Sequence, residues 1–384
     1  PARAIVNLAA IRNNTELLQR AAADLGSQVM AVLKADAYGH GAVRVAHAMA
    51  ECGVNAFAVA TVVEAVELRC GGIADAKILV LGAPMPGDVP LLMRYSLDCM
   101  VSSYDVAARI ARVTSEAGDP RPGDTSTAGR LGVHLYIETG MTRLGVLPDE
   151  VPRVLDVLHS AVLEGRIGLS GLCTHFAEAD DPASDYVADQ LKRFDVAVAA
   201  VHAHPLALRN AADIPVHISN SAALLDARFH EVLRQYGSSY VRPGCALYGL
   251  HPEVCHRRGE HELGEKVAEG PRRVWVKELA IHSAMDGQLE EAMTFVAAVA
   301  NVMEVPAGTT VGKCSSFLRL LSKSKEAAGT GYSRTTTTEE RCLIATLGVG
   351  YADGYPRAAS RKAQVRAAPF SPLQHHLSRA AAVI

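Results

Sequence analysis

Short runs of apolar residues recur along the first part of the chain, each bounded by turn-forming or polar residues. The runs are VMAVLK (29–34), NAFAVA (55–60), KILVLG (77–82), LDCMVS (97–102), HLYIET (134–139), GLCTHF (171–176), PVHISN (215–220) and SYVRPG (239–244). Apolar runs between turn residues are typical of buried β-strands. The pattern therefore predicts eight strands within residues 29–244.

Segments with helical periodicity lie between several of these runs, at residues 61–70, 103–118 and 188–201. Strands that alternate with helices indicate a parallel (β/α)8 barrel of the TIM type. Parallel strands are buried on both faces, and for that reason they read as continuous apolar runs. A doubly wound open sheet is the alternative that the same alternation leaves open.

The character of the chain changes after residue 250. Residues 251–273 are charged and poor in apolar periodicity, which is typical of a linker. Residues 294–312 and 341–357 contain β-like runs closed by Pro and Gly, which predicts a smaller β domain, whereas residues 313–331 between them read as a basic insertion. We therefore divide the chain into a barrel at 1–250, a charged linker at 251–293 and a partial β domain at 294–384.

Composition and charge narrow the classes of partner. The chain is 49% hydrophobic and 21% charged with a net charge of -3, so it should fold around a sizeable core and has no electrostatic reason to bind nucleic acid or an anionic membrane. No apolar run reaches the roughly 18 residues of a membrane span. The 8 cysteines are scattered without a C-x-x-C pair, and the N-terminus lacks an apolar signal-peptide core. We expect a cytoplasmic protein that binds a small molecule.

Residues able to bind an anion gather where the predicted strands end. In a (β/α)8 barrel these ends meet at one mouth, which carries the chemistry. The residues there are Lys34, Tyr38, Arg143, His175, His217, Asn220, Ser221, Arg242 and Gly244. Such a set suits a ligand with phosphate or carboxylate groups, and we assign no metal ligands.

An ordinary structural role explains each of these residues taken singly. Lys34 could reach the rim of the barrel, His175 could be a hydrogen-bonded core histidine, and Arg242 could brace the turn at Pro243. The run HISNSAA could be a strand followed by a helix N-cap. A charged amine at the end of a buried strand nevertheless costs several kcal/mol unless it is paired, neutral or covalently modified. Convergence at one mouth therefore favours a ligand site.

Several longer stretches carry a family resemblance. They include AVLKADAYGHGA (31–42), HLYIETGMTRLGV (134–146), THFAEAD (174–180), HISNSAA (217–223), YVRPGCALYGL (240–250) and LGVGYADGYPR (347–357). These stretches occur in the order found in alanine racemases, which are fold-type III pyridoxal phosphate enzymes. The resemblance implies a barrel followed by a β domain, a head-to-tail homodimer, pyridoxal 5'-phosphate as cofactor, and racemisation of alanine that supplies D-alanine for peptidoglycan.

The resemblance also implies roles for individual residues. Lys34 matches the lysine that forms a Schiff base with the cofactor and acts on one face of the substrate, and Tyr351 matches the tyrosine that the partner subunit supplies to the other face. His175 matches the histidine that assists this tyrosine, and Arg242 matches the arginine facing the pyridine nitrogen. Arg143 matches the arginine near the substrate carboxylate. The implied cofactor-binding residues are Lys34, Tyr38, His175, Asn220, Ser221, Arg242 and Gly244.

Three departures from the family pattern stand out. Tyr136 occupies a position where many members carry a lysine that helps to orient the equivalent of Arg143. The segment 313–331 interrupts a stretch that is nearly continuous in the family, and the motifs expected after GYADGYPR are missing. Two alternatives to alanine racemisation therefore stay open: a racemase with wider substrate choice, such as serine, and a truncated homologue that binds the cofactor without catalysis. A decarboxylase is less favoured because GYADG and YVRPG match the racemases.

Overall fold

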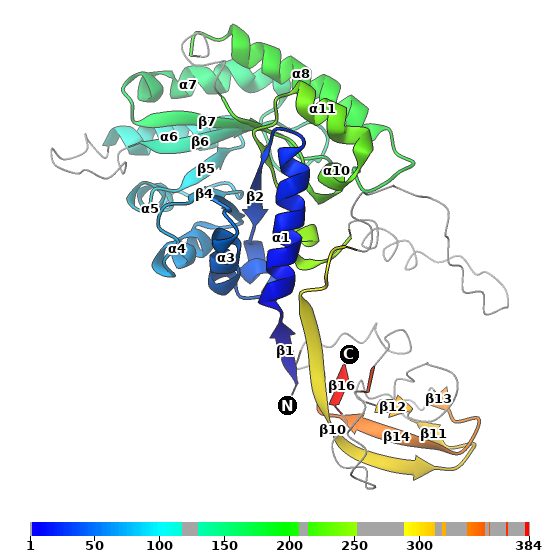
Figure 1. The fold of residues 1–384 in the computed structure, drawn as a ribbon. Coiled ribbons are helices and arrows are strands. Elements are labelled where there is room, and N and C mark those ends of the chain that lie inside the picture. The colour runs from blue at the N-terminus through cyan, green and yellow to red at the C-terminus, as the bar shows by residue number, and fades with distance from the viewer. Residues whose placement is uncertain are drawn as a thin grey trace. The chain divides into compact units, whose positions relative to one another are not determined.

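Two compact units make up the fold in the computed structural model (Figure 1). One comprises Leu8–Glu291, and the other comprises Pro1–Asn7 with Ala292–Ile384. The structure describes residues 2–116, 130–206, 214–251, 288–311, 317–319, 336–349, 353, 366–367 and 381–383.

The first unit contains an eight-stranded parallel sheet in the order β8-β7-β6-β5-β4-β3-β2-β9. The strands are β2 (Gln28–Val32), β3 (Ala56–Val59), β4 (Lys77–Val80), β5 (Asp98–Val101), β6 (Leu131–Tyr136), β7 (Ile167–Cys173), β8 (Val216–His217) and β9 (Tyr240–Val241). Parallel bridges join Val216 to Ser238 and Ser219 to Val241, so the two end strands meet and the sheet closes. The predicted barrel and all eight predicted strands are confirmed, and the open-sheet alternative is wrong because the edge strands pair with each other.

The barrel interior explains why the strands read as continuous apolar runs. A cluster of buried side chains fills it: Met30, Val32, Ala56, Ala58, Leu79, Met100, Tyr136 and Cys173. Every residue of β3 is buried. Both faces of these strands are mostly buried, so the alternation of polar and apolar residues that marks a half-exposed sheet is absent.

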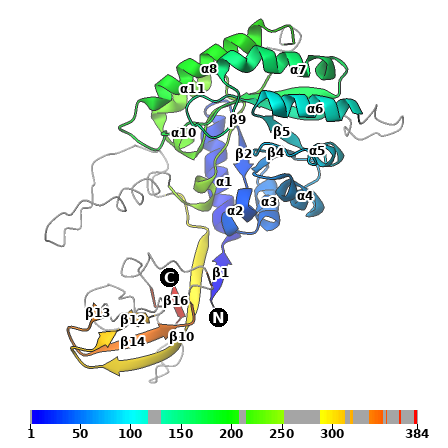
Figure 2. The same cartoon turned by 180° about the vertical axis from the view of Figure 1, so that it is seen from behind.

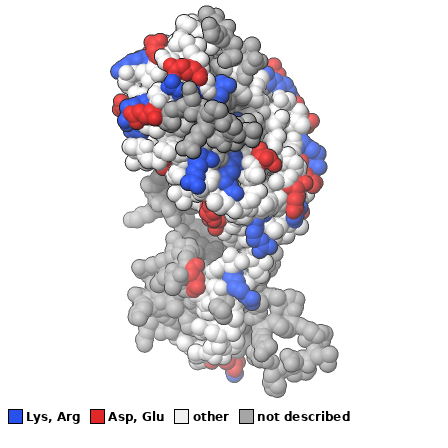
Figure 3. Space-filling model, turned by 90° about the vertical axis from the view of Figure 1, so that its left-hand side faces the viewer, with Lys and Arg blue, Asp and Glu red and all other residues white. Residues whose placement is uncertain are grey.

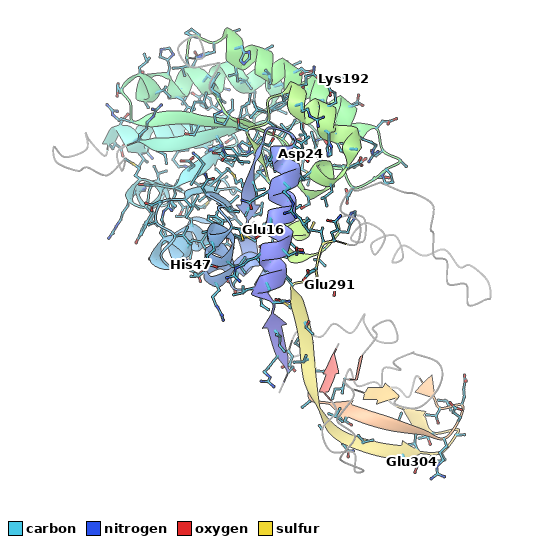
Figure 4. The ribbon with its side chains drawn as sticks, viewed as in Figure 1. Glu16, Asp24, His47, Lys192, Glu291 and Glu304 are labelled. Carbon is cyan, nitrogen blue, oxygen red and sulfur yellow. The ribbon has the colours of Figure 1, made fainter. Side chains whose placement is uncertain are left out.

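Helices surround the strands of this unit (Figures 1 and 2). They are α1 (Leu8–Ala23), α3 (Ala42–Glu51), α4 (Val62–Cys70), α5 (Val89–Arg94), α6 (Tyr104–Glu116), α7 (Val151–Leu163), α8 (Tyr186–Ala203), α10 (Ser221–Leu225) and α11 (His230–Gln235), with the 3-10 turns η1 (Pro148–Glu150), η3 (Ala227–Phe229) and η4 (Cys245–Tyr248). In α1, Leu17 and Leu18 are buried, whereas Glu16, labelled in Figure 4, is exposed, as is Asp24 just after the helix. The hydrophobic stripe of α1 is therefore buried against the rest of the unit.

The second unit is a sheet of antiparallel strands with two further short strands. Its strands are β1 (Arg3–Val6), β10 (Met293–Val305), β12 (Phe317–Arg319), β14 (Cys342–Leu347), β15 (Arg366–Ala367) and β16 (Ala381–Val383), and β11 (Thr310–Val311) pairs with β13 (Thr336–Thr337). Ala297, Leu347 and Val349 form its buried cluster. The sequence-based division placed residues 1–250 in one domain, but β1 pairs with β10 from Arg3 opposite Val296 to Val6 opposite Met293, and these backbone hydrogen bonds group it with the β unit.

Several sequence predictions concern residues outside the described ones. They are Tyr351, residues 252–287 of the expected linker, and all of the expected insertion at 313–331 except β12, which pairs with β14. Among the described residues no helix has the length and apolar character needed to span a membrane. Acidic and basic side chains are interspersed on the face drawn in Figure 3, as the small net charge leads one to expect.

Candidate active site

A cavity of about 470 Å³ opens among the C-terminal ends of the barrel strands. Its lining includes all but one of the described residues that the sequence placed at the mouth: Lys34, Tyr38, Arg143, His175, Asn220, Ser221, Arg242 and Gly244. The exception is His217, which is fully buried and contacts Arg242. The expected catalytic residue Tyr351 lies outside the described residues.

Lys34 begins an unusual turn directly after β2. The segment Lys34–Gly39 (α2) has left-handed backbone angles from Ala35 to Tyr38, with φ between 53° and 55°. Left-handed geometry costs non-glycine residues roughly 1 to 2 kcal/mol each, so the surroundings must hold the turn in place. Asp36 accepts a hydrogen bond from the N–H of Ala42 over 2.6 Å, which fixes the end of the turn. The turn brings both Lys34 and Tyr38 to the cavity.

Tyr38, Ser221 and Gly244 meet at one corner of the cavity. The backbone N–H of Gly244 donates a hydrogen bond to Ser221 Oγ over 2.9 Å. Glycine is required there for space, because a Cβ on Gly244 would lie 2.4 Å from Tyr38 Oη. Desolvation raises the pKa of Tyr38 to about 12, so its hydroxyl keeps the hydrogen that it can donate. The hydroxyl groups of Tyr38 and Ser221, beside a glycine that leaves space, can bind a phosphate at this corner.

Asn220 has the structural role that the sequence left open for it. Its Oδ1 accepts a hydrogen bond from the N–H of Ala223 over 3.0 Å, so Asn220 is the N-cap of α10. Its Nδ2 donates to the carbonyl of Phe176 over 3.3 Å. The residue therefore joins the loop after β7 to the start of α10 while it lines the cavity.

Arg242 is held by acceptors on neighbouring strand ends. Its guanidinium donates to Nδ1 of His217 over 2.7 Å, to the carbonyl of His217, and to the carbonyl of Thr174 over 2.7 Å. The residue is only 6% exposed, and burial lowers the pKa of its guanidinium from the ordinary value. Because the ordinary pKa of a guanidinium exceeds about 12, Arg242 still carries its positive charge. These three acceptors hold the cation at the cavity.

His175 lies next to this arginine. Its Nδ1 is 3.3 Å from a donor nitrogen of Arg242. Burial, assisted by the positive charges of Arg242 and Arg143, lowers the pKa of His175 to about 3. The imidazole is therefore neutral at physiological pH, and because Nδ1 faces a donor, its hydrogen is on Nε2.

Arg143 lies beside the hydroxyl of Tyr136. Burial raises the pKa of Tyr136, so its hydroxyl remains neutral and able to accept from the guanidinium. Arg143 itself is exposed to the mouth, where a planar guanidinium can bind a carboxylate through two hydrogen bonds.

The sequence did not identify two residues that hold parts of the site in place, Glu64 and His134. Glu64 accepts a hydrogen bond from the N–H of Ala35 and so holds the turn that begins at Lys34. Its position in the pattern T-x-x-E is a capping-box signal that can be read from the sequence. His134 binds the far side of His217 over 2.8 Å. His134 lies in the middle of a strand, where no local pattern distinguishes it from any other core position.

Comparison with known proteins agrees with this geometry. Residues 6–252 match the family model for the alanine racemase N-terminal domain, and residues 313–369 match that for the C-terminal domain. The alanine racemase of Desulforamulus reducens is 32% identical over 367 residues, which cover 95% of this chain and 80% of the relative. The solved alanine racemase of Streptomyces coelicolor A3(2) has a TM-score of 0.71 and 27% identity, covering 100% of this chain and 84% of the other.

A barrel with a lysine and two arginines at its mouth, followed by a β unit, defines the architecture of a fold-type III pyridoxal phosphate enzyme. The chain belongs to the alanine racemase family. This family depends on pyridoxal 5'-phosphate, and the solved alanine racemase of Bartonella henselae, which shares the fold at a TM-score of 0.67 and 21% identity over 100% of this chain and 85% of that one, carries it covalently bound.

The described residues fit this cofactor. Lys34 supplies an amine inside the cavity, and Tyr38 and Ser221 supply hydroxyls at the corner where Gly244 leaves room. Arg242 supplies a fixed cation at the buried side. An amine, hydroxyl donors and a cation are the groups that an aldehyde, a phosphate and a ring nitrogen respectively require.

Proposed function

We propose that this protein interconverts L-alanine and D-alanine with pyridoxal 5'-phosphate bound in the cavity. The observation that supports the proposal best is the convergence of one amine, Lys34, and two guanidinium groups, Arg143 and Arg242, on one cavity in a chain of this family. When bound, the cofactor links to the amino group of an amino acid and withdraws electrons from its Cα, which makes the Cα proton removable.

Lys34 has two tasks in this proposal. It holds the cofactor covalently, and once released it removes or returns the Cα proton on one face of the substrate. Attachment of the cofactor and removal of the proton need a neutral amine, because an ammonium group is neither a nucleophile nor a base, whereas return of the proton needs the ammonium form. The left-handed turn that begins at Lys34 keeps the residue at the cavity.

Racemisation needs a second acid or base on the opposite face of Cα. We assign this role to Tyr351, supplied by the partner subunit of a homodimer. A tyrosine has an ordinary pKa of about 10, so it needs a neighbour that stabilises its charged form. His175 is suited to this because it is neutral and carries its hydrogen on Nε2, which can donate to the tyrosine oxygen.

The arginines direct the reaction and bind the substrate. Arg242 holds its protons tightly, so it cannot hand one to a ring nitrogen, and weaker electron withdrawal favours return of the proton to Cα over transamination. Arg143 binds the alanine carboxylate with two parallel hydrogen bonds. A linker and a β domain after the barrel, with β1 counted in the β unit, and a cytoplasmic location remain part of the proposal.

Chiral analysis of L-alanine incubated with the purified protein and added pyridoxal phosphate tests the function. D-alanine is expected with the native chain, and Tyr351→Phe should abolish it. Visible absorbance from the lysine-bound cofactor should appear in both of these proteins and be lost in Lys34→Ala. Absorbance without D-alanine would overturn the racemase and leave a cofactor-binding homologue, and faster turnover of serine than of alanine would replace alanine as the substrate.

A further inference from the structure

A row of buried polar side chains crosses the barrel interior behind the cavity. Arg242 donates to His217 Nδ1 over 2.7 Å, and His217 Nε2 lies 2.8 Å from His134 Nδ1. His134 Nε2 lies 3.1 Å from Oδ2 of Asp98, which also accepts from Lys77 Nζ over 2.6 Å. His134 and His217 are both 0% exposed. The row therefore links the cavity to a carboxylate at the start of β5 without contact with water at either histidine.

The two ends of the row together set the direction of each hydrogen bond. The guanidinium can only donate and the carboxylate can only accept, so Nδ1 of His217 accepts and its hydrogen is on Nε2. Nδ1 of His134 then accepts in turn, which leaves the hydrogen on Nε2 to be donated to Asp98. Burial lowers the pKa of both histidines, so they are neutral, and hydrogen bonding to His134 and Lys77 lowers the pKa of Asp98 to about 2. One arrangement of hydrogens satisfies the whole row.

Two glycines make room for the row. A Cβ on Gly132 of β6 would lie 2.0 Å from Oδ1 of Asp98, and a Cβ on Gly171 of β7 would lie 2.1 Å from Nδ1 of His134. Neither glycine has a positive φ, so the backbone does not require glycine at these positions. Glycine at these two positions leaves the space that the carboxylate of Asp98 and the imidazole of His134 occupy.

We propose that Asp98 and His134 are positioning residues for Arg242, acting through the single tautomer that they impose on His217. If Asp98 did not accept from His134, both imidazoles could exchange the positions of their hydrogens, and His217 would present an N–H to the guanidinium in place of a lone pair. The importance of Arg242 for catalysis rests on the proposed function, but the tautomer of His217 does not.

Nitrogen NMR of protein labelled at histidine reads the tautomers directly, with the two resonances assigned by their loss in His134→Gln and His217→Gln. In the native protein both rings should have an unprotonated Nδ1 at neutral pH. A hydrogen on Nδ1 of either ring would overturn the proposal whether or not the protein makes D-alanine. In Asp98→Ala, His217 should populate both tautomers, and an unchanged single tautomer would also overturn it.

Glycine variants on one strand supply a matched pair for kinetics. Gly171→Ala displaces the His134 ring, whereas Gly168→Ala on the same strand meets the side chain of Arg130, with Nε 2.5 Å away, and that flexible chain can move. Gly171→Ala and Asp98→Ala should lower kcat roughly 10- to 100-fold with KM for alanine little changed, and Gly168→Ala should leave both constants near native. Equal losses in the two glycine variants would indicate general strand damage and count against a positioning role.

Discussion

Glu64 Oε1 accepts a hydrogen bond from the backbone N–H of Ala35 over 2.7 Å. The other oxygen of the same carboxylate accepts from the N–H groups of Ala60 over 2.7 Å and Thr61 over 3.1 Å, which completes the capping box of α4. One side chain thus joins the start of a barrel helix to the left-handed turn that follows Lys34. The position of Lys34 therefore depends on a residue thirty positions further along the chain.

Replacement of this carboxylate should destabilise the protein and disturb the lysine. Glu64→Ala leaves three backbone N–H groups without their acceptor, and we expect the free energy of unfolding to fall by about 2 to 4 kcal/mol. Chemical denaturation measures this change, and cofactor uptake should slow in parallel. Glu67→Ala, an exposed acid on the same helix, is the control and should stay within about 0.5 kcal/mol of native. A similar loss in both variants would refute the specific role of Glu64.

The close contact between Tyr38 and Gly244 can be tested with a variant that narrows this space and a second variant that restores it. Gly244→Ala places a Cβ 2.4 Å from Tyr38 Oη and 3.3 Å from its Cζ, so the tyrosine must move. We expect affinity for pyridoxal phosphate to fall about 10- to 100-fold, which corresponds to roughly 1 to 3 kcal/mol of overpacking. Spectroscopic titration measures this affinity. Tyr38→Phe removes the closest atom, so the double variant should lose less than the sum of the single losses, and full additivity would contradict the steric explanation.

Buried histidines should make the protein sensitive to mild acid. Burial lowers the pKa of His134, His175 and His217, whereas unfolded histidine titrates near 6.5. Below that pH the unfolded chain binds protons that the folded chain does not, so stability falls as the pH falls, by up to about 1.4 kcal/mol per pH unit for each histidine. For His175 the effect ends near its folded pKa of about 3. Above the unfolded pKa these groups contribute no pH dependence.

Urea denaturation at about pH 7.5 and about pH 5.5 measures this effect. The free energy of unfolding should be smaller at the lower pH. His175→Gln should reduce this difference by the contribution of one titrating histidine. Asp98 does not confuse the result, because its pKa of about 2 lies below the ordinary 3.8 and its stabilisation is lost only at pH values below this window. Equal stability at both pH values would show that the folded and unfolded chains bind the same number of protons in this range, and it would contradict the neutral state assigned to these histidines.

Tyr136 offers a test of how Arg143 is held. Tyr136→Phe removes the hydroxyl beside the guanidinium but keeps the buried ring, so the fold should be little affected. We expect KM for alanine to rise about 5- to 30-fold, because a neutral hydrogen bond to a charged group is worth roughly 1 to 2 kcal/mol. Steady-state kinetics in both directions measures it. An unchanged KM would mean that Arg143 is oriented without Tyr136.

Much of the fold followed from local pattern. The eight apolar runs became eight parallel strands because burial on both faces leaves no polar alternation, and that signal is local. Residues such as Lys34 and Arg242 could be placed at one mouth from the sequence because parallel strands direct all their C-terminal ends the same way. The division at residue 250 missed the pairing of β1 with β10, because residues almost three hundred positions apart share no local signal.

The sequence by itself determined the barrel, its layers and the residues at its mouth, since periodicity and strand direction are properties of short segments. The tertiary structure decided how those residues act. Gly244 proved to leave space and to donate to Ser221, and Arg242 proved to depend on His217. Contacts of this kind depend on distances between atoms on different strands, which barrel closure fixes and which no stretch of sequence records.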